Sequence, residues 1–168
     1  MEEKVTTAAI KGLIISLIMI VFSLVTIYAE QTENKALGFV PIAVLLAGVI
    51  WGCIVFARQK DHNVTFGNVF AHGFKTTAAV IALMAVYMLL LFLVIKPELK
   101  DLALEQSRQA LEKQNMSEAD IQNALDVTNK IFLPAAIGGA MVTYALIGCI
   151  ASLIGAGVAK KNPNPTPF

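Results

Sequence analysis

The sequence is poor in charged residues, which make up 15% of its 168 residues, against roughly 25% in an average soluble domain. The deficit is concentrated in four stretches, because no Asp, Glu, Lys or Arg occurs in residues 12–29, 36–57, 76–95 or 131–159. A run of 18 or more apolar residues is long enough for a helix to cross the hydrocarbon core of a bilayer, which is about 30 Å thick. All four runs meet this criterion, which excludes an ordinary soluble domain.

Cysteine and histidine are also scarce. The two cysteines, Cys53 and Cys149, both lie in apolar runs and show neither zinc nor redox spacing. Without a nucleophile–base arrangement or a metal-ligand spacing, we predict no catalytic residues, no metal site, no cofactor and no nucleic-acid partner, and therefore not an enzyme. The charge-free runs hold no ionisable acid or base of the kind that marks ion paths, which disfavours an ion-coupled transporter.

The apolar runs predict the fold. In lipid, each backbone amide must find its partner within its own segment, so the runs should be helices. We predict an all-α integral membrane four-helix bundle, one domain over residues 1–168, with an extramembrane helical hairpin between spans three and four. The first run exceeds the usual apolar region of a signal peptide and is interpreted as a span. The expected segments are spans at about 8–29, 36–57, 76–95 and 132–158, an amphipathic elbow at 65–77 and the hairpin at 97–130.

The orientation follows from the basic residues. An even number of spans places both termini and the second loop on one side, with 7 of the 13 Lys and Arg residues. The other side carries 6, and Arg108 and Lys113 lie deep in the long third loop, where they count less. We therefore predict both termini in the cytoplasm.

The third loop is the largest polar segment. PELKDLALEQSRQALEKQ has the composition of a helix, with Pro97 suited to a first turn. Ser117, followed three residues later by Asp120, resembles a capping box that starts a second helix, whereas Pro134 is expected in the first turn of span four. The hairpin either covers the ends of spans three and four or docks a protein partner or an envelope polymer.

Small residues recur in spans two and four. They allow helix backbones to approach closely, either within one chain or in a homodimer. The candidate helix-packing residues are Gly48, Gly52, Gly148, Ser152 and Gly155.

The segment HNVTFGNVFAHGFKTT holds both histidines, His62 and His72. On a helix it is amphipathic, with Asn68, His72 and Lys75 on its polar face. We interpret it either as an elbow at the membrane surface or as a ligand-binding site formed by those three residues.

Several segments together resemble a known family. They are EEKVTTAAIKGLIISL, WGC, FARQKDHNVTFGNVFAHGFKTT, the hairpin and IASLIGAGVAKKNP. Their order is similar to that of a Bacteroidota membrane family catalogued as domain of unknown function 4199. The resemblance implies a four-helix protein of the inner (cytoplasmic) membrane of a Gram-negative bacterium and no particular activity.

Two functions remain open at this stage. The first is a non-enzymatic accessory or scaffold protein that binds a partner through the hairpin or the span faces. The alternative is a lipid- or small-molecule-binding protein, or passive carrier, with a cytoplasmic-side mouth near His72.

Overall fold

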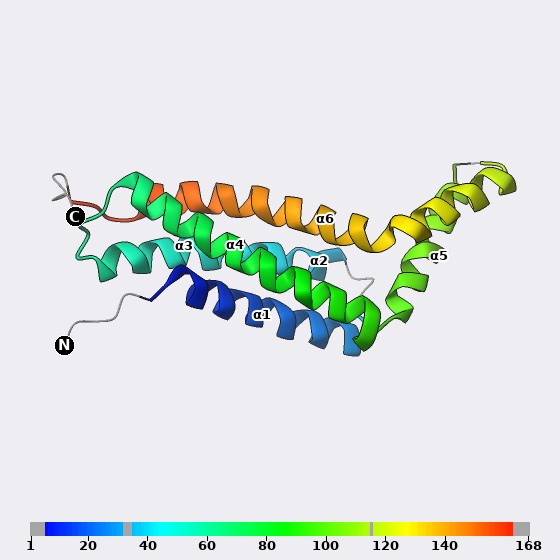
Figure 1. Cartoon of the computed structure of the whole chain (residues 1–168), viewed down its shortest axis with the longest axis horizontal. Coiled ribbons are helices and arrows are strands. Elements are labelled where there is room, and N and C mark those ends of the chain that lie inside the picture. The colour runs from blue at the N-terminus through cyan, green and yellow to red at the C-terminus, as the bar shows by residue number, and fades with distance from the viewer. Residues whose placement is uncertain (1–5, 32–34, 115, 163–168) are drawn as a thin grey trace. The chain divides into compact units, whose positions relative to one another are not determined.

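The computed structural model describes residues 6–31, 35–114 and 116–162, and these residues form helices and turns without a β-strand. Four helices in this part of the chain are long and apolar enough to cross a membrane. The predicted all-α fold with four apolar spans is therefore confirmed at this level. Along the chain the elements are α1 (Ala8–Tyr28), α2 (Lys35–Gly38), α3 (Val40–Gln59), α4 (Phe66–Leu90), η1 (Leu91–Ile95), α5 (Glu98–Glu112) and α6 (Glu118–Val158) (Figure 1).

The chain divides into two units. The first comprises Met1–Met84 and Val142–Phe168, and the second comprises Ala85–Met141. In the first unit, α1, α3, the beginning of α4 and the end of α6 run alongside one another (Figure 1). Their outward-facing residues are apolar, including Leu17 and Leu146, which are 59% and 62% exposed. Such an apolar surface belongs in lipid, where it needs no protein cover.

Glycines let the helices of the first unit approach closely. A Cβ at Gly48 would lie 2.7 Å from the Ile15 side chain, and one at Gly52 would meet the Lys11 side chain at 3.5 Å. Gly148 faces the Thr77 side chain and Gly155 faces Cys53. Ser152 is fully buried, and its hydroxyl lies 2.8 Å from the position of a Cβ at Gly73. All five predicted helix-packing residues thus contact, or lie against, another helix of the same chain.

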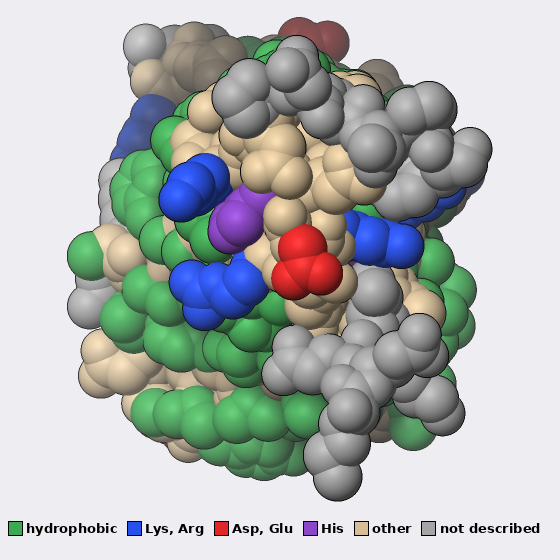
Figure 2. All heavy atoms as spheres, turned by 90° about the vertical axis from the view of Figure 1, so that its left-hand side faces the viewer, with side chains coloured by type: hydrophobic (Ala, Val, Ile, Leu, Met, Phe, Trp, Pro, Cys, Tyr) green, Lys and Arg blue, Asp and Glu red, His purple; other side chains and the backbone are tan. Residues whose placement is uncertain are grey.

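The turn between α3 and α4 holds both described ends of the chain. The Thr6 N–H donates to Gln59 Oε1 at 3.1 Å, and Gln59 Nε2 donates to Thr6 Oγ1 at 2.9 Å. The Asn162 N–H donates to the His62 carbonyl at 2.9 Å, and His62 Nδ1 lies 2.9 Å from the Lys160 carbonyl oxygen. These contacts place the segments around Thr6 and Asn162 at one end of the first unit, the end that Figure 2 faces.

The second unit contains η1, α5 and the beginning of α6. Phe92 and Phe132 meet edge to face, with ring centroids 5.2 Å apart. The predicted cap of α6 is confirmed, because Ser117 Oγ accepts from the Asp120 N–H at 3.3 Å and donates to Asp120 Oδ2 at 2.6 Å. The prediction for Pro134 is wrong: it lies inside α6, which runs unbroken from Glu118 to Val158. Helices in a membrane tolerate an interior proline because neighbouring groups satisfy the freed carbonyl.

Candidate functional site

A polar centre is buried in the first unit, close to the α3–α4 turn. It forms around Lys11, which lies in the first turn of α1 and is 0% exposed. Lys11 Nζ donates to the Gly52 carbonyl in α3 at 3.1 Å and lies 3.1 Å from His72 Nε2 in α4. An ammonium has donors and no acceptor, so His72 Nε2 accepts in this contact and the imidazole carries its proton on Nδ1. One side chain therefore ties three helices together.

Phe56 completes the centre. Its ring stacks on the His72 imidazole with centroids 4.1 Å apart and planes 10° from parallel. Lys11 Nζ lies 5.8 Å from the Phe56 centroid, within the range of a cation–π contact. Cys53, also 0% exposed, directs its thiol at the Val69 carbonyl oxygen, 3.7 Å away. The centre thus stabilises the Lys11 cation with neutral groups.

No carboxylate pairs with Lys11 among the residues that the structure describes. Burying an ammonium without a counter-ion is costly. Its position in the first turn of α1 adds to this cost, because a helix N-terminus disfavours positive charge. The groups positioned to offset these penalties for a protonated Lys11 are the Gly52 carbonyl, the His72 imidazole and the Phe56 ring.

The structure separates the three predicted ligand-binding residues by exposure. His72 is only 9% exposed and faces Lys11, whereas Asn68 and Lys75 are exposed on α4. The predicted elbow is the beginning of α4, which continues without a break into the third apolar span. His72 therefore belongs to the interior of the bundle, and Asn68 and Lys75 belong to its surface.

Sequence reasoning missed Lys11. The first charge-free run begins one residue later, so Lys11 was counted with the surface cations. Its signal lies in the helical spacing, because Lys11, Ile15 and Met19 are four residues apart and all are buried. With Thr7 as the N-cap of α1, whose side chain accepts from the Ile10 N–H, Lys11 falls on the buried side of the helix.

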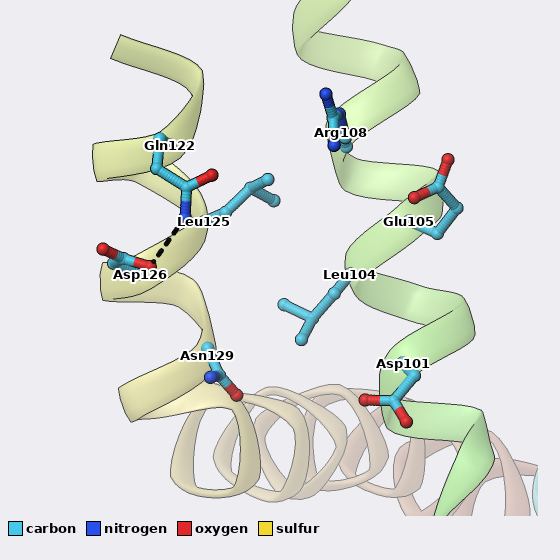
Figure 3. Close-up of a pocket in the computed structure, with 8 residues that line it drawn as sticks. All are labelled: Asp101, Leu104, Glu105, Arg108, Gln122, Leu125, Asp126 and Asn129. Atoms are coloured by element: carbon cyan, nitrogen blue, oxygen red, sulfur yellow. Dashed lines mark hydrogen bonds between the residues drawn. The ribbon is translucent and has the colours of Figure 1, made fainter. Parts of the chain in front are cut away.

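A second candidate site is a groove in the second unit. Leu104 of α5 and Leu125 of α6 point toward each other across it (Figure 3). The groove has a volume of about 260 Å³. We call it the acidic groove, and its lining consists of Asp101, Leu104, Glu105, Arg108, Gln122, Leu125, Asp126 and Asn129.

Arg108 is the one basic residue of this lining. Its Nε donates to Glu112 Oε1 at 3.0 Å and its Nη2 donates to Glu118 Oε1 at 3.0 Å. The hydrogen bond to Glu112, with the charges of Glu118 and Glu112, raises the pKa of the guanidinium above its ordinary value. The Arg108 charge is therefore matched by carboxylates outside the groove. Asp101, Glu105 and Asp126 leave the groove itself negative.

The comparison with known families gives one match. The model of a family described as "Protein of unknown function (DUF4199)" matches residues 10–161. The chain belongs to the DUF4199 family. This confirms the resemblance predicted from the order of its segments. Neither a curated protein nor a solved structure matches the chain.

The family match spans both candidate sites of this DUF4199 protein. Residues 10–161 include Lys11 and His72 of the polar centre and the whole lining of the acidic groove. No group of three or more His, Cys, Asp and Glu side chains able to hold a metal ion occurs in the described part of the chain. The chemistry available at the two sites is therefore that of a buried cation and of an open acidic surface.

Proposed function

We propose that the protein is a non-enzymatic scaffold of a bacterial inner membrane and that it docks a basic segment of a protein partner in the acidic groove. The observation that carries this proposal is the groove's combination of a leucine floor with acidic walls. Leu104 and Leu125 are half-buried, while Asp101, Glu105 and Asp126 are exposed. A basic amphipathic helix matches both features, with apolar residues on the leucines and Lys or Arg on the carboxylates.

In this proposal, the first unit anchors the protein in the membrane. Lys11 joins α1, α3 and α4 through its contacts with Gly52 and His72. An ammonium enclosed in this way favours a fixed arrangement of the helices over one that opens during a transport cycle. The first unit would then serve as a rigid membrane anchor for the protein.

The orientation is part of the proposal. The end of the first unit that holds Thr6 and Asn162 is rich in basic side chains around one acidic side chain (Figure 2). Its charged residues include Arg58, Lys60, Lys160 and Lys161, with Asp61. Basic residues next to spans favour the cytoplasmic side. We therefore propose that α5 and the acidic groove, which lie between the third and fourth spans, face the periplasm.

The test is photo-crosslinking in the native membrane. The variant Gln122→p-benzoylphenylalanine places the reactive group in the groove, and Gln106→p-benzoylphenylalanine, at an exposed position on α5 outside the groove lining, is the matched control. We expect one protein adduct from the groove position, joined through a peptide of net positive charge. Adding Asp101→Asn and Asp126→Asn should remove that adduct, because the partner's cations lose their counter-charges.

Two results would contradict the docking proposal. One is an adduct of equal yield from both positions, which would show that the groove is not selective. The other is an adduct that survives both Asp→Asn changes, which would show that charge does not select the partner. The recovered peptide identifies the partner's docking segment directly.

A second candidate function is favoured by the charge of Lys11. The described residues supply no carboxylate to it, so a small anionic ligand entering beside His72 could supply the counter-charge. His72→Phe would retain a ring against Phe56 and remove the Nε2 acceptor. A small anion seen on the native protein by mass spectrometry, and absent from Lys11→Met, would favour this carrier function. A protein without such an anion would leave the scaffold function as the better account.

A further inference from the structure

An apolar groove runs along the membrane-facing side of the first unit. It lies between α1 and α3 and has a volume of about 450 Å³. On α3 it is lined by Gly48 and Ala47, whose side chains are absent or small, and by Val44 and Trp51. The complete lining is Ile14, Ile15, Ile18, Val44, Ala47, Gly48 and Trp51.

Arg58 lies on the same face of α3 as this groove. Ala47, Trp51 and Arg58 are spaced by four and seven residues, which is one face of a helix, and all three are exposed. Seven residues rise about 10 Å along an α-helix, so Arg58 lies two turns beyond Trp51 toward the α3–α4 turn. Its guanidinium has no hydrogen-bond or ion-pair partner among the described residues.

The charges around Arg58 favour an anion. The same end of the unit carries Lys60, Lys160 and Lys161, with Asp61 as the one acid among residues 57–65 and 155–162. A guanidinium presents paired N–H donors that match a phosphate. The groove is lined by apolar side chains of α1 and α3, two helices long and apolar enough to cross a membrane, where acyl chains would be the surrounding solvent.

We propose that this face is a binding site for one anionic phospholipid. Its phosphate pairs with Arg58 and one acyl chain lies in the groove between α1 and α3. This site differs from general contact with lipid, because Arg58 lies two helical turns from the apolar groove on the same face of α3. This site belongs to the first unit and does not depend on the proposed docking function of the acidic groove.

The experiment is native mass spectrometry of the full-length protein from mixed micelles of phosphatidylglycerol and phosphatidylcholine. The wild-type protein should retain one phosphatidylglycerol in preference to phosphatidylcholine. Arg58→Gln should reduce that preference roughly five-fold, the size expected for one basic residue facing an anionic headgroup. Ala47→Phe fills the groove and should reduce retention of both lipids.

Two matched variants separate this site from bulk effects. Lys160→Gln removes a cation at the same end of the unit outside the groove, and Ala78→Phe adds the same bulk at an exposed position of α4. Both should retain lipid like the wild type. Equal losses in Arg58→Gln and Lys160→Gln would indicate diffuse attraction and overturn the site. Unchanged retention in Arg58→Gln, whose exposed position leaves folding intact, would overturn it as well.

Discussion

Lys11 Nζ and His72 Nε2 lie 3.1 Å apart inside the helical bundle, although 61 residues separate them in the sequence. Both side chains are basic. In this hydrogen bond the Lys11 ammonium donates and the neutral His72 imidazole accepts through Nε2. Lys11 also reaches the Gly52 carbonyl. The pair therefore acts as a tie between α1, α3 and α4. Replacing His72 and replacing Lys11 should change the free energy of unfolding by different amounts.

The free energy of unfolding should depend most strongly on His72, the acceptor of this tie. His72→Phe keeps a ring beside Phe56 but leaves the buried Lys11 ammonium with one acceptor fewer. We expect the free energy of unfolding to fall by about 1–3 kcal/mol, the cost of an unsatisfied buried polar group. Adding Lys11→Met removes the unsatisfied charge, so the double variant should recover most of that loss. Unfolding of the full-length protein in detergent measures both effects.

The control for the tie is Lys160→Met, which removes a cation from an exposed position. Its effect on the free energy of unfolding should stay within about 0.5 kcal/mol. Additive losses in the double variant would show that Lys11 and His72 act independently, and this would refute the proposed tie.

Close helix contact in the first unit depends on glycine. A Cβ at Gly148 would overlap the Thr77 side chain, whereas no atom lies within 4 Å of a Cβ at Gly157. Gly148→Ala should lower the free energy of unfolding by about 1–3 kcal/mol through overpacking. Gly157→Ala, on the same helix, should be neutral or slightly stabilising, because alanine favours the helix. Thermal unfolding of the two variants in one detergent gives the comparison.

A second substitution tests the cause of that difference. Thr77→Ala removes the hydroxyl and methyl groups that the new Cβ would meet. In the Gly148→Ala background it should restore part of the lost stability, because the Cβ of residue 77 remains and would lie 2.8 Å from the new Cβ. A double variant no more stable than Gly148→Ala alone would mean that the glycine is needed for another reason.

Charges in the acidic groove should act with opposite signs on a basic ligand. Asp126→Asn removes a negative charge from the lining and should weaken binding of a short Lys/Leu amphipathic peptide roughly 2–5-fold. Arg108→Gln removes the one basic side chain of the lining and frees Glu112 and Glu118, so it should strengthen binding. Fluorescence titration of the full-length protein measures both affinities.

The matched control for these charges is Glu98→Gln, which removes an exposed acid of α5 from outside the groove. Its affinity for the peptide should remain close to that of the wild type. If Asp126→Asn and Glu98→Gln weaken binding equally, net charge governs the interaction and the groove has no special role.

The helices were predictable from the sequence because their signal is local. Each span is a charge-free run, and the Ser117 cap of α6 is encoded within four residues. The interior was less predictable, because it depends on which side of each helix faces the others. Lys11 adjoins a charge-free run and has the composition of a surface residue. Only its spacing with Ile15 and Met19 places it inside.

Other features depend on contacts between distant segments. The groove of α5 and α6 forms from residues about 20 positions apart, such as Leu104 and Leu125, and no motif in the sequence joins them. Pro134 was misplaced for a related reason. Proline favours a first helical turn, but the cap at Ser117 starts α6 well before it, and the helix continues past the proline.

Orientation in the membrane is open to a direct test with two cysteine variants. Met116→Cys lies between α5 and α6, and Lys160→Cys lies beyond the end of α6, both at exposed positions. If both termini face the cytoplasm, a membrane-impermeant maleimide should label Met116→Cys once the outer membrane is permeabilised. Lys160→Cys should react only after the inner membrane is opened. The parent protein measures background from Cys53, which is fully buried, and half-buried Cys149. The reverse order of labelling would invert the topology and place the acidic groove in the cytoplasm.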